Sequence, residues 1–181
     1  MDDLPALLGL RARLRPWRPD DAPAIHAACQ DPEIQRWTTV PVPYGPDDAE
    51  DFLARRVPEA RARGGAAFAV DDMTDGADGA LAGSMTLLHV ERGVGEIGYW
   101  IAPWARRRGL GADALDTLAS WAFSQQLAHR LELQIEPDNH ASRALAVRAD
   151  FAPEGLLRAR VLVDGERRDV LMHGRVVPWA R

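Results

Sequence analysis

Apolar and polar residues alternate along several stretches of the chain, a pattern typical of strands with one exposed face. GLRARLRPW (9–17) and RLELQIE (130–136) alternate most clearly. The runs GAAFAVD (65–71), LAGSMTLLHV (81–90) and GEIGYWI (95–101) predict three further strands, which follow one another directly. The sequence therefore predicts a sheet in which successive strands occupy the middle of the chain.

Apolar residues at helical spacing separate these strands. Helices are predicted from Asp20-Asp21 onward, as a short turn over 32–37, over 48–63, after Gly111 and over 139–149. The stretch between the second and third of these helices holds three prolines and is predicted to be a loop. Helices thus occur both before and after the central strands.

A hairpin is predicted at the C-terminal end, where Asp164-Gly165 separates LLRARVLV (156–163) from ERRDVLMHGRV (166–176). The order of elements is then strand, two or three helices, three strands, helix, strand, helix and two strands. A doubly wound parallel fold requires regular alternation of strand and helix, which the three successive strands exclude. The sequence predicts one α+β domain with a mixed sheet.

Composition excludes several classes of function. The chain has 181 residues, 46% of them hydrophobic, and a net charge of −5, so we expect no nucleic-acid partner. No apolar run approaches the ~20 residues that cross a bilayer, and we expect no membrane association. The single cysteine, Cys29, suits a reducing compartment, so a cytoplasmic location is expected. The five histidines show no metal-ligand spacing, and no metal is expected.

The stretch WIAPWARRRGLGADALDTLASWAF (100–123) places three arginines before a glycine turn, although the chain has no lysine. A strand, a glycine turn and a helix start form an anion site, because the first N–H groups of a helix lack internal partners. A Walker A loop is impossible without lysine. A dinucleotide fingerprint needs a third glycine at position 114, which is alanine. The remaining pattern is Arg106-x-x-Gly109-x-Gly111.

This pattern resembles the acyl-CoA pyrophosphate loop of the GNAT superfamily of N-acetyltransferases. RLRPWRPDDAPAI (13–25), GEIGYWIAP (95–103) and PDNHASRALAVRADF (137–151) resemble its RimJ/RimL-like branch, which acetylates ribosomal-protein N-termini and various amines. The resemblance implies one acyl-CoA N-acyltransferase domain over 1–181, with acetyl-CoA as co-substrate. It also implies a mostly antiparallel sheet of about seven strands, flanked by helices, whose central strands splay apart.

The resemblance further indicates which residues bind acyl-CoA. The backbone at Trp100-Ile101, on the strand before the loop, would bind the thioester carbonyl and pantetheine. The loop and the next helix would bind the pyrophosphate. The expected acyl-CoA-binding residues are Ile101, Arg106, Arg107, Arg108, Gly109, Leu110, Gly111, Ala112, Asn139 and Ser142.

Two residues are expected to transfer protons. Many superfamily members have a tyrosine acid seven residues after the asparagine of the last core helix, but here that position is Ala146. In the RimJ/RimL-like branch the proposed acid is a serine three residues after the asparagine, here Ser142, on the same helix face as Asn139. A strand glutamate is the suggested base, and Glu96 matches it. The alternatives are helix capping for Asn139 and Ser142, and a hydrogen bond to a neighbouring element for Glu96.

The acceptor amine would bind in a pocket that aromatic residues line. The candidates to line an acceptor pocket, with burial in the core as the alternative, are Trp37, Tyr44, Trp100 and Trp104. The expected acceptor is a protein N-terminus or a small-molecule amine. A non-catalytic CoA-binding sensor and a succinyl donor remain as alternatives. A homodimer is expected because dimers are common in the family.

Overall fold

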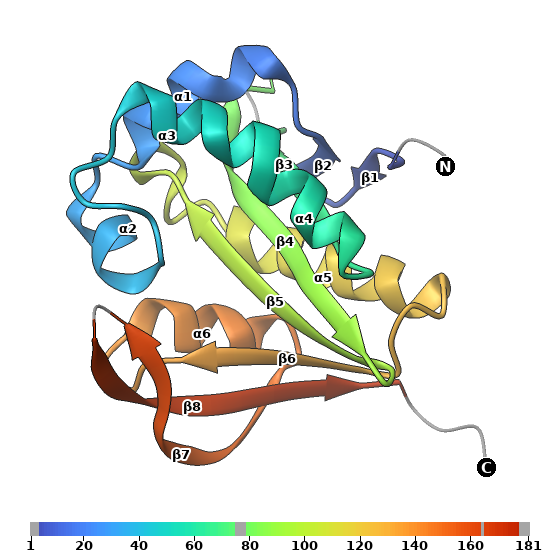
Figure 1. Ribbon diagram of the computed structural model, residues 1–181. Coiled ribbons are helices and arrows are strands. Elements are labelled where there is room, and N and C mark those ends of the chain that lie inside the picture. The colour runs from blue at the N-terminus through green and yellow to red at the C-terminus, as the bar shows by residue number, and fades with distance from the viewer. Residues whose placement is uncertain (1–3, 75–78, 164, 178–181) are drawn as a thin grey trace.

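A mixed sheet of eight strands forms the centre of the protein in the computed structural model, which describes residues 4–74, 79–163 and 165–177 (Figure 1). The strands are β1 (Leu7–Leu8), β2 (Ala12–Pro16), β3 (Ala66–Asp72), β4 (Leu81–Glu91), β5 (Val94–Ile101), β6 (Arg130–Ile135), β7 (Ala152–Val163) and β8 (Glu166–Val176). Their order is β1-β2-β3-β4-β5-β6-β8-β7, and only β5 and β6 are parallel neighbours. The predicted α+β class and mostly antiparallel sheet are confirmed, with the short β1 as an additional strand.

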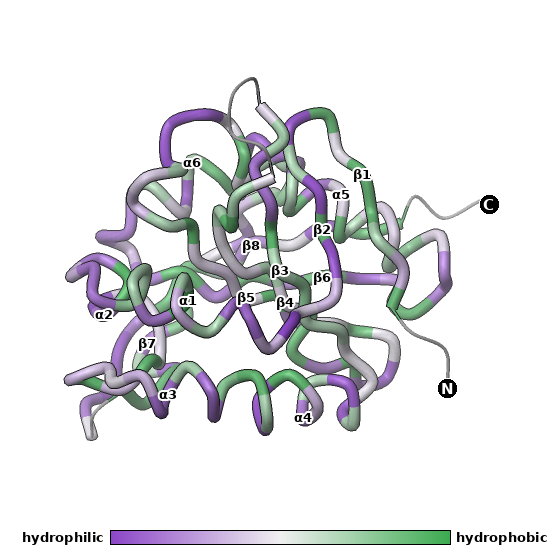
Figure 2. The backbone as a smooth tube through the Cα atoms, turned by 90° about the horizontal axis from the view of Figure 1, so that it is seen from above, coloured by the Kyte–Doolittle hydropathy of each residue, from purple (hydrophilic) through white to green (hydrophobic). Residues whose placement is uncertain are grey.

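Helices cover both faces of the sheet. They are η1 (Pro19–Asp21), α1 (Ala22–Ala28), α2 (Pro32–Trp37), α3 (Pro46–Asp51), η2 (Phe52–Arg56), α4 (Val57–Ala62), η3 (Pro103–Ala105), α5 (Leu110–Ser124) and α6 (His140–Arg148). Seen from above, α3 and α4 lie on one side of the central strands, and α5 and α6 lie on the other (Figure 2). None of the helices in the described part of the chain is long and apolar enough to cross a membrane.

Each face of the sheet packs against its own hydrophobic cluster. One cluster joins α5 and α6 to the sheet and contains Phe68 and Leu118, both fully buried. The other lies beneath α1, α2 and α3 and contains Ile25, Ile34 and Trp100. Complete burial of one such side chain contributes about 1.5–3 kcal/mol, so these clusters hold both helical layers against the strands.

The N-terminal strand differs from the prediction of one strand over 9–17. The chain turns at Gly9, whose N–H donates to the Ala12 carbonyl (2.8 Å), and β2 begins only after this turn. The turn is bound by Asp113 in the first turn of α5, whose carboxylate accepts the N–H groups of residues 10–12 at 3.0, 2.9 and 2.9 Å. A contact between distant parts of the chain therefore shortens the strand.

The helix expected over 48–63 is continuous in direction but changes its winding. Between α3 and α4, the segment η2 has π-helical geometry, and Pro58 follows at the start of α4. Proline lacks an N–H and its ring crowds the preceding turn, so a locally wider turn accommodates it. The turns expected around 72–80 and at Asp164-Gly165 fall partly outside the described residues, at 75–78 and 164.

The two parallel strands separate from each other along their length. β5 and β6 pair only at Val94–Arg130, Gly95–Leu131 and Glu96–Glu132. Beyond Glu96, the rest of β5 continues beside β4, and β6 continues beside β8. The predicted splay of the central strands is confirmed, and it leaves a fork with one free strand edge on each side.

Candidate functional site

The loop between β5 and α5 ends in an open helix N-terminus. Gly109 is the N-cap of α5, with φ of 80° and ψ of −1°, a left-handed conformation that glycine adopts without strain. The first-turn N–H groups of Leu110, Gly111 and Ala112 have no acceptor within the helix. Together with the positive end of the helix dipole, they form a site suited to a diphosphate.

Arg106 fixes this loop to β5 and α2. Its Nε donates to the Ile101 carbonyl (3.1 Å), and its other nitrogens donate to both carboxylate oxygens of Asp31 (2.6 and 3.3 Å). Asp31 is also the N-cap of α2 and accepts the Ile34 N–H (3.0 Å). Burial would raise the pKa of Asp31, but the hydrogen bonds from Arg106 and Ile34 outweigh it and lower that pKa. The Arg106 side chain is thus engaged with protein groups, and its contact with acyl-CoA stays a prediction.

Other arginines surround the start of α5. Arg108 pairs with Asp72 at the end of β3 (2.7 Å) while 49% of its side chain stays exposed. Arg107 is exposed, with φ of 65°. Arg11, which no sequence motif marks, comes from the turn before β2. Its Cδ lies 3.5 Å from where a Cβ on Gly109 would stand. Positive side chains from two distant segments therefore flank the helix N-terminus.

Gly111 has a packing function that was not expected. A Cβ at this position would lie 2.5 Å from Leu145 Cδ1 and 3.2 Å from Ile101 Cγ1. The space that the missing side chain leaves is filled by α6 and β5. The glycine therefore lets α5, α6 and β5 pack closely, while its N–H still belongs to the open first turn.

The first turn of α6 brings Asn139 and Ser142 to β5. Asn139 is the N-cap of α6, and its Oδ1 accepts the Ser142 N–H (3.0 Å). The Ser142 hydroxyl is hydrogen-bonded to the Tyr99 hydroxyl (2.7 Å). Burial raises the pKa of Tyr99 to about 12, although the hydrogen bond with Ser142 opposes the increase. Capping is therefore performed by Asn139, whereas the serine hydroxyl contacts a side chain on the neighbouring strand.

Glu96 lies where the fork begins, opposite Glu132 in the last paired position of β5 and β6. Its Oε2 accepts a hydrogen bond from Gln134 Nε2 (2.8 Å). The second amide atom, Gln134 Oε1, is buried and has no hydrogen-bond partner within the described ranges. An unpaired buried acceptor is unfavourable, so the hydrogen bonding of this amide is incomplete while its Nε2 holds Glu96.

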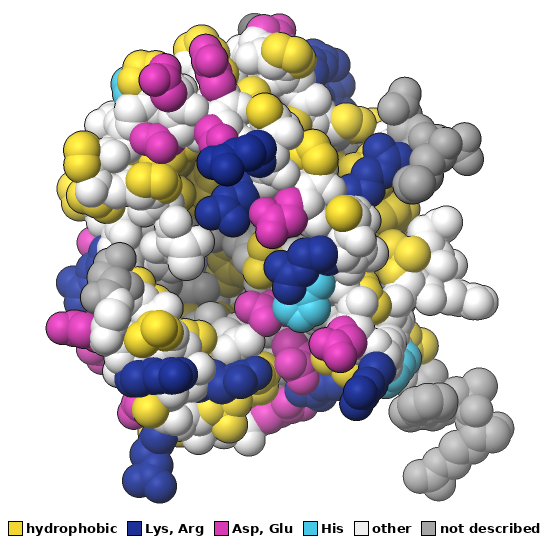
Figure 3. All heavy atoms as spheres, viewed as in Figure 1, with side chains coloured by type: hydrophobic (Ala, Val, Ile, Leu, Met, Phe, Trp, Pro, Cys, Tyr) yellow, Lys and Arg dark blue, Asp and Glu magenta, His cyan; other side chains and the backbone are white. Residues whose placement is uncertain are grey.

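Glu96 and Tyr99 project from opposite faces of β5, because they are three positions apart on a strand whose side chains alternate between its two faces. Glu96 shares its face with Trp100 and the helical layer α1–α3, whereas Tyr99 and Ser142 lie on the α6 side. Figure 3 shows the face hollowed between the helical layer and the β7–β8 hairpin. A carboxylate and a hydroxyl pair thus flank one fork, and such groups can accept and donate protons during acyl transfer.

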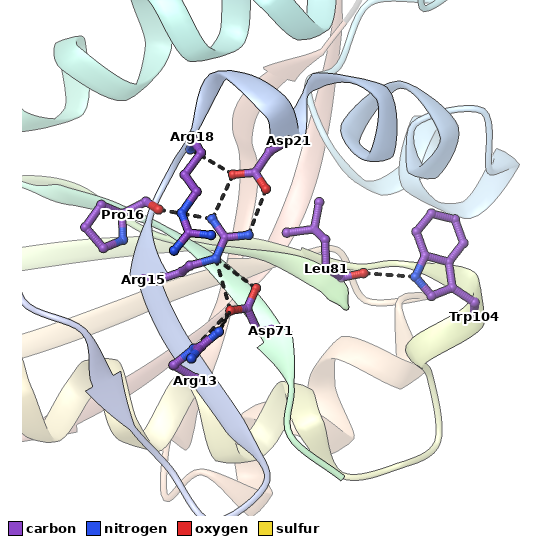
Figure 4. Close-up of polar contacts among 8 residues, drawn as sticks. All are labelled: Arg13, Arg15, Pro16, Arg18, Asp21, Asp71, Leu81 and Trp104. Carbon is purple, nitrogen blue, oxygen red and sulfur yellow. Dashed lines mark hydrogen bonds and ion pairs between the residues drawn. The ribbon is translucent and has the colours of Figure 1, made fainter. Parts of the chain in front are cut away.

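The four predicted pocket aromatics have different exposures. Tyr44 and Trp100 are buried in the core, with only 6% and 9% of their surface exposed. Trp104 is 44% exposed and is held by the donation of its Nε1 to the Leu81 carbonyl (2.9 Å; Figure 4). Trp37, at the end of α2, is half-buried. Trp37 and Trp104 therefore keep the ring surface that an acceptor could contact.

The stretch RLRPWRPDD contains a buried ion network (Figure 4). Arg15 donates to both carboxylate oxygens of Asp21 (2.7 and 2.8 Å) and to Asp71 (3.0 Å). Arg13 also donates to Asp71 (2.7 Å), whose side chain is 0% exposed. These contacts join β2 to β3 and η1, so this part of the resemblance has a structural role.

Several residues at the site were not singled out from the sequence: Tyr99, Gln134, Arg11, Asp72 and Asp31. Strand alternation could have found Tyr99 and Gln134, since it predicts which residues of β5 and β6 share a face. The contacts of the other three depend on segments that are distant in the sequence. Across the described ranges, no three or more His, Cys, Asp or Glu side chains are grouped to hold a metal ion.

The chain is similar in sequence to known acetyltransferases. The acetyltransferase (GNAT) domain family matches residues 11–152. YdaF of Bacillus subtilis (strain 168), provisionally named a ribosomal N-acetyltransferase, is 31% identical over 98 residues. These residues are 53% of this chain and 54% of YdaF, so the match spans about half the length of that curated relative.

Solved structures share the fold over nearly the whole chain. Mycobacterium smegmatis RimJ, in complex with CoA-disulfide, matches with a TM-score of 0.83 and 27% identity, covering 95% of this chain and 87% of RimJ. A ribosomal-protein-S5-alanine acetyltransferase from Vibrio fischeri, at 17% identity, shares the fold with a TM-score of 0.79 and coverage of 96% and 97%. With the family match over most of its length, the chain belongs to the GNAT family of acetyltransferases.

Proposed function

We propose that the protein is an acyl-CoA-dependent N-acetyltransferase that transfers the acetyl group directly to a primary amine. The observation that carries the proposal is the fork between β5 and β6, with Glu96 on one face, Ser142 on the other and the open N-terminus of α5 after β5. Direct transfer requires a base, an acid and a site for the CoA phosphates. A CoA-binding sensor would require only the last of these.

Acyl-CoA binding would use backbone groups more than side chains. The free edge of β5 beyond Glu96 offers N–H and C=O groups with which the pantetheine amides can pair, as an added strand would. The diphosphate would accept the N–H groups of Leu110, Gly111 and Ala112. Exposed Arg107 and half-exposed Arg108 would add positive charge beside it. A backbone N–H near Ile101 would donate a hydrogen bond to the thioester carbonyl oxygen.

The chemistry would then follow from the two faces of the fork. The acceptor ammonium loses a proton to Glu96, directly or through a water molecule. Gln134 would orient this carboxylate through the hydrogen bond that its Nε2 donates to Glu96 Oε2 (2.8 Å). The amine nitrogen attacks the thioester carbonyl, the C–S bond breaks, the nitrogen loses its second proton to water as the amide forms, and Ser142 provides a proton to the sulfur. No covalent enzyme intermediate is needed.

We further propose a protein N-terminus as the acceptor. YdaF is provisionally named a ribosomal N-acetyltransferase, and the Vibrio fischeri enzyme is named a ribosomal-protein-S5-alanine acetyltransferase. The net charge of −5 also favours approach of a cationic amine. A small-molecule amine is the alternative acceptor, and a succinyl group is the alternative donor.

A transfer assay tests this proposal. The purified protein is incubated with acetyl-CoA or succinyl-CoA and with peptides of differing N-terminal residue, or with small amines, while free thiol and product mass are measured. We expect acetyl-CoA-dependent acylation of the α-amino group of at least one peptide. Tight CoA binding by calorimetry without thiol release for any acceptor would instead support the sensor. Acylation confined to small amines would overturn the proposed acceptor.

A further inference from the structure

The Ser142 hydroxyl is hydrogen-bonded to a second hydroxyl group, which comes from β5. Its Oγ lies 2.7 Å from the hydroxyl of Tyr99, 43 residues earlier in the chain. The same tyrosine hydroxyl lies 3.4 Å from the Ser142 carbonyl oxygen, and the Ser142 N–H is bound by the Asn139 cap. The serine is thus held on both sides, with the tyrosine beside it on the splayed part of β5.

A serine hydroxyl alone is a poor proton source for a thiolate. A thiol has a pKa of ~8.5, whereas an aliphatic hydroxyl resembles water, whose pKa is ~15.7. Complete transfer from serine would therefore be unfavourable by roughly seven powers of ten. The ordinary phenol pKa of ~10 is raised to about 12 for Tyr99, which still halves this gap to roughly three or four powers of ten.

The position at which many superfamily members have their tyrosine acid cannot hold one here. Ala146 is 0% exposed and belongs to the cluster between α6 and the sheet. A phenol ring at this position would overfill a packed core, which typically costs about 1–3 kcal/mol or more. Tyr99 brings a phenol to the first turn of α6 from the opposite element, the strand.

We propose that Tyr99 supplies, through the Ser142 hydroxyl, the proton that the departing CoA thiolate takes. The inference rests on the proposed acetyl transfer. As the C–S bond breaks and its electron pair moves to sulfur, the sulfur takes the Ser142 proton and Ser142 Oγ takes the Tyr99 proton. The resulting phenolate regains a proton from solvent, which balances the second proton that the acceptor nitrogen releases to solvent as the amide forms. Tyr99 acts through Ser142 and is a positioning residue.

The first test is a double-mutant cycle with Tyr99→Phe, which removes the hydroxyl and keeps the ring. We expect kcat to fall about 10- to 100-fold, at or below the usual range for acid catalysis, with KM for acetyl-CoA and calorimetric CoA affinity within about twofold of wild type. The double variant Tyr99→Phe/Ser142→Ala should be no slower than Ser142→Ala alone, because both changes break the same relay. Additive losses in kcat would overturn the relay.

The second test uses the fact that the chain has only two tyrosines, Tyr44 and Tyr99. In a Tyr44→Phe background, biosynthetic incorporation of fluorotyrosine labels Tyr99 alone and lowers its phenol pKa. The phenolate absorbance gives the midpoint directly, and Ser142→Ala should move it to higher pH by removing a hydrogen bond that stabilises the phenolate. In the same background, the alkaline decline of kcat should begin at lower pH with fluorotyrosine than with tyrosine, because the phenol must be protonated.

The outcomes separate the relay from the proposed function. An inactive wild type with every acceptor would overturn the acetyltransferase proposal and the relay with it. Two results with an active wild type would overturn the relay alone. One is a Tyr99→Phe variant that keeps full kcat, and the other is an alkaline decline of kcat that begins at the same pH with tyrosine and with fluorotyrosine. A lower melting temperature with unchanged kcat would assign the Tyr99 hydroxyl to structure.

Discussion

Asn139 and Ser142 stand on one helical turn, yet their contacts assign them separate tasks. The asparagine side chain caps α6 through the serine N–H, which every residue at position 142 except proline retains. Ser142→Ala therefore leaves the cap intact and is expected to lower kcat by roughly 10- to 1000-fold. Asn139→Ala removes the cap and should lower the free energy of unfolding by about 0.5–2 kcal/mol. Steady-state kinetics and denaturant melts measure both effects; full kcat in Ser142→Ala would exclude the acid role.

Glu96 permits a matched comparison with the carboxylate opposite it. Glu96→Gln removes a titratable group from the start of the fork, so kcat should fall at least tenfold and the acidic limb of the pH–rate profile should flatten or move. Glu132→Gln changes a carboxylate in the paired position across the strands, where it accepts a hydrogen bond from Arg130 (2.7 Å). The control should keep the wild-type acidic limb. Identical profiles for all three proteins would leave Glu96 a structural residue.

The bounds of helices and strands were predicted where neighbouring residues in the sequence set them. The short helix over 32–37 was predicted within its observed bounds, because Pro32 and the Asp31 cap mark its start. The strand over 9–17 was predicted too long, because the carboxylate that binds its first residues comes from Asp113, about a hundred residues later. Side-chain identity alone does not reveal such a contact. Boundaries made by distant partners therefore escaped prediction, as did the short β1 and the π-helical η2, whereas the types of the longer elements did not.

The loop after β5 offers an element-scale prediction of pH dependence. Asp31→Asn keeps a side chain able to cap α2 but removes the charge that pairs with Arg106. Loss of this charge-assisted pair should cost about 1–2 kcal/mol near pH 7. The pKa of Asp31 in the folded protein lies below its usual 3.8. The difference in free energy of unfolding between wild type and Asp31→Asn is therefore complete above roughly pH 5, and it disappears as the pH falls through the folded-state pKa of Asp31.

Urea melts of wild type and Asp31→Asn between pH 2 and 7 measure this difference, since the subtraction removes other titrating groups. Calorimetry at pH 7 should also report weaker CoA binding by the variant, because the pair holds the loop before α5. A stability difference that persists unchanged at pH 2 would contradict the assignment.

The whole-molecule arrangement explains why the candidate site was only half visible in the sequence. Glu96, Ser142 and the glycine loop were predicted because a family pattern marks them. Their partners Tyr99 and Gln134 depend on how β5, β6 and α6 meet, which is set by the register of the sheet. Tyr44 and Trp100 were predicted to line the pocket but are buried in the core, because an aromatic residue is suited to either place.

Two adjacent aspartates test how the whole molecule is held together. Asp71 is fully buried and receives hydrogen bonds from Arg13 and Arg15, so it links β2 to β3. Removing one partner of a buried ion pair leaves charge uncompensated, and the usual cost is about 3–5 kcal/mol. Asp71→Asn should fall near the lower end of this range, because Arg15 keeps its pair with Asp21. The corresponding decrease in melting temperature is about 6–12 °C.

Asp72→Asn is the matched control for this prediction. Its ion-pair partner Arg108 is 49% exposed, and solvent screening limits such pairs to about 1 kcal/mol or less. The Thr74 N–H that Asp72 accepts (2.9 Å) can still be bound by an asparagine oxygen. Differential scanning calorimetry of both variants should therefore show a large decrease for Asp71→Asn and a small one for Asp72→Asn. Equal decreases would mean that the ion network does not join the first strands to the sheet as its burial implies.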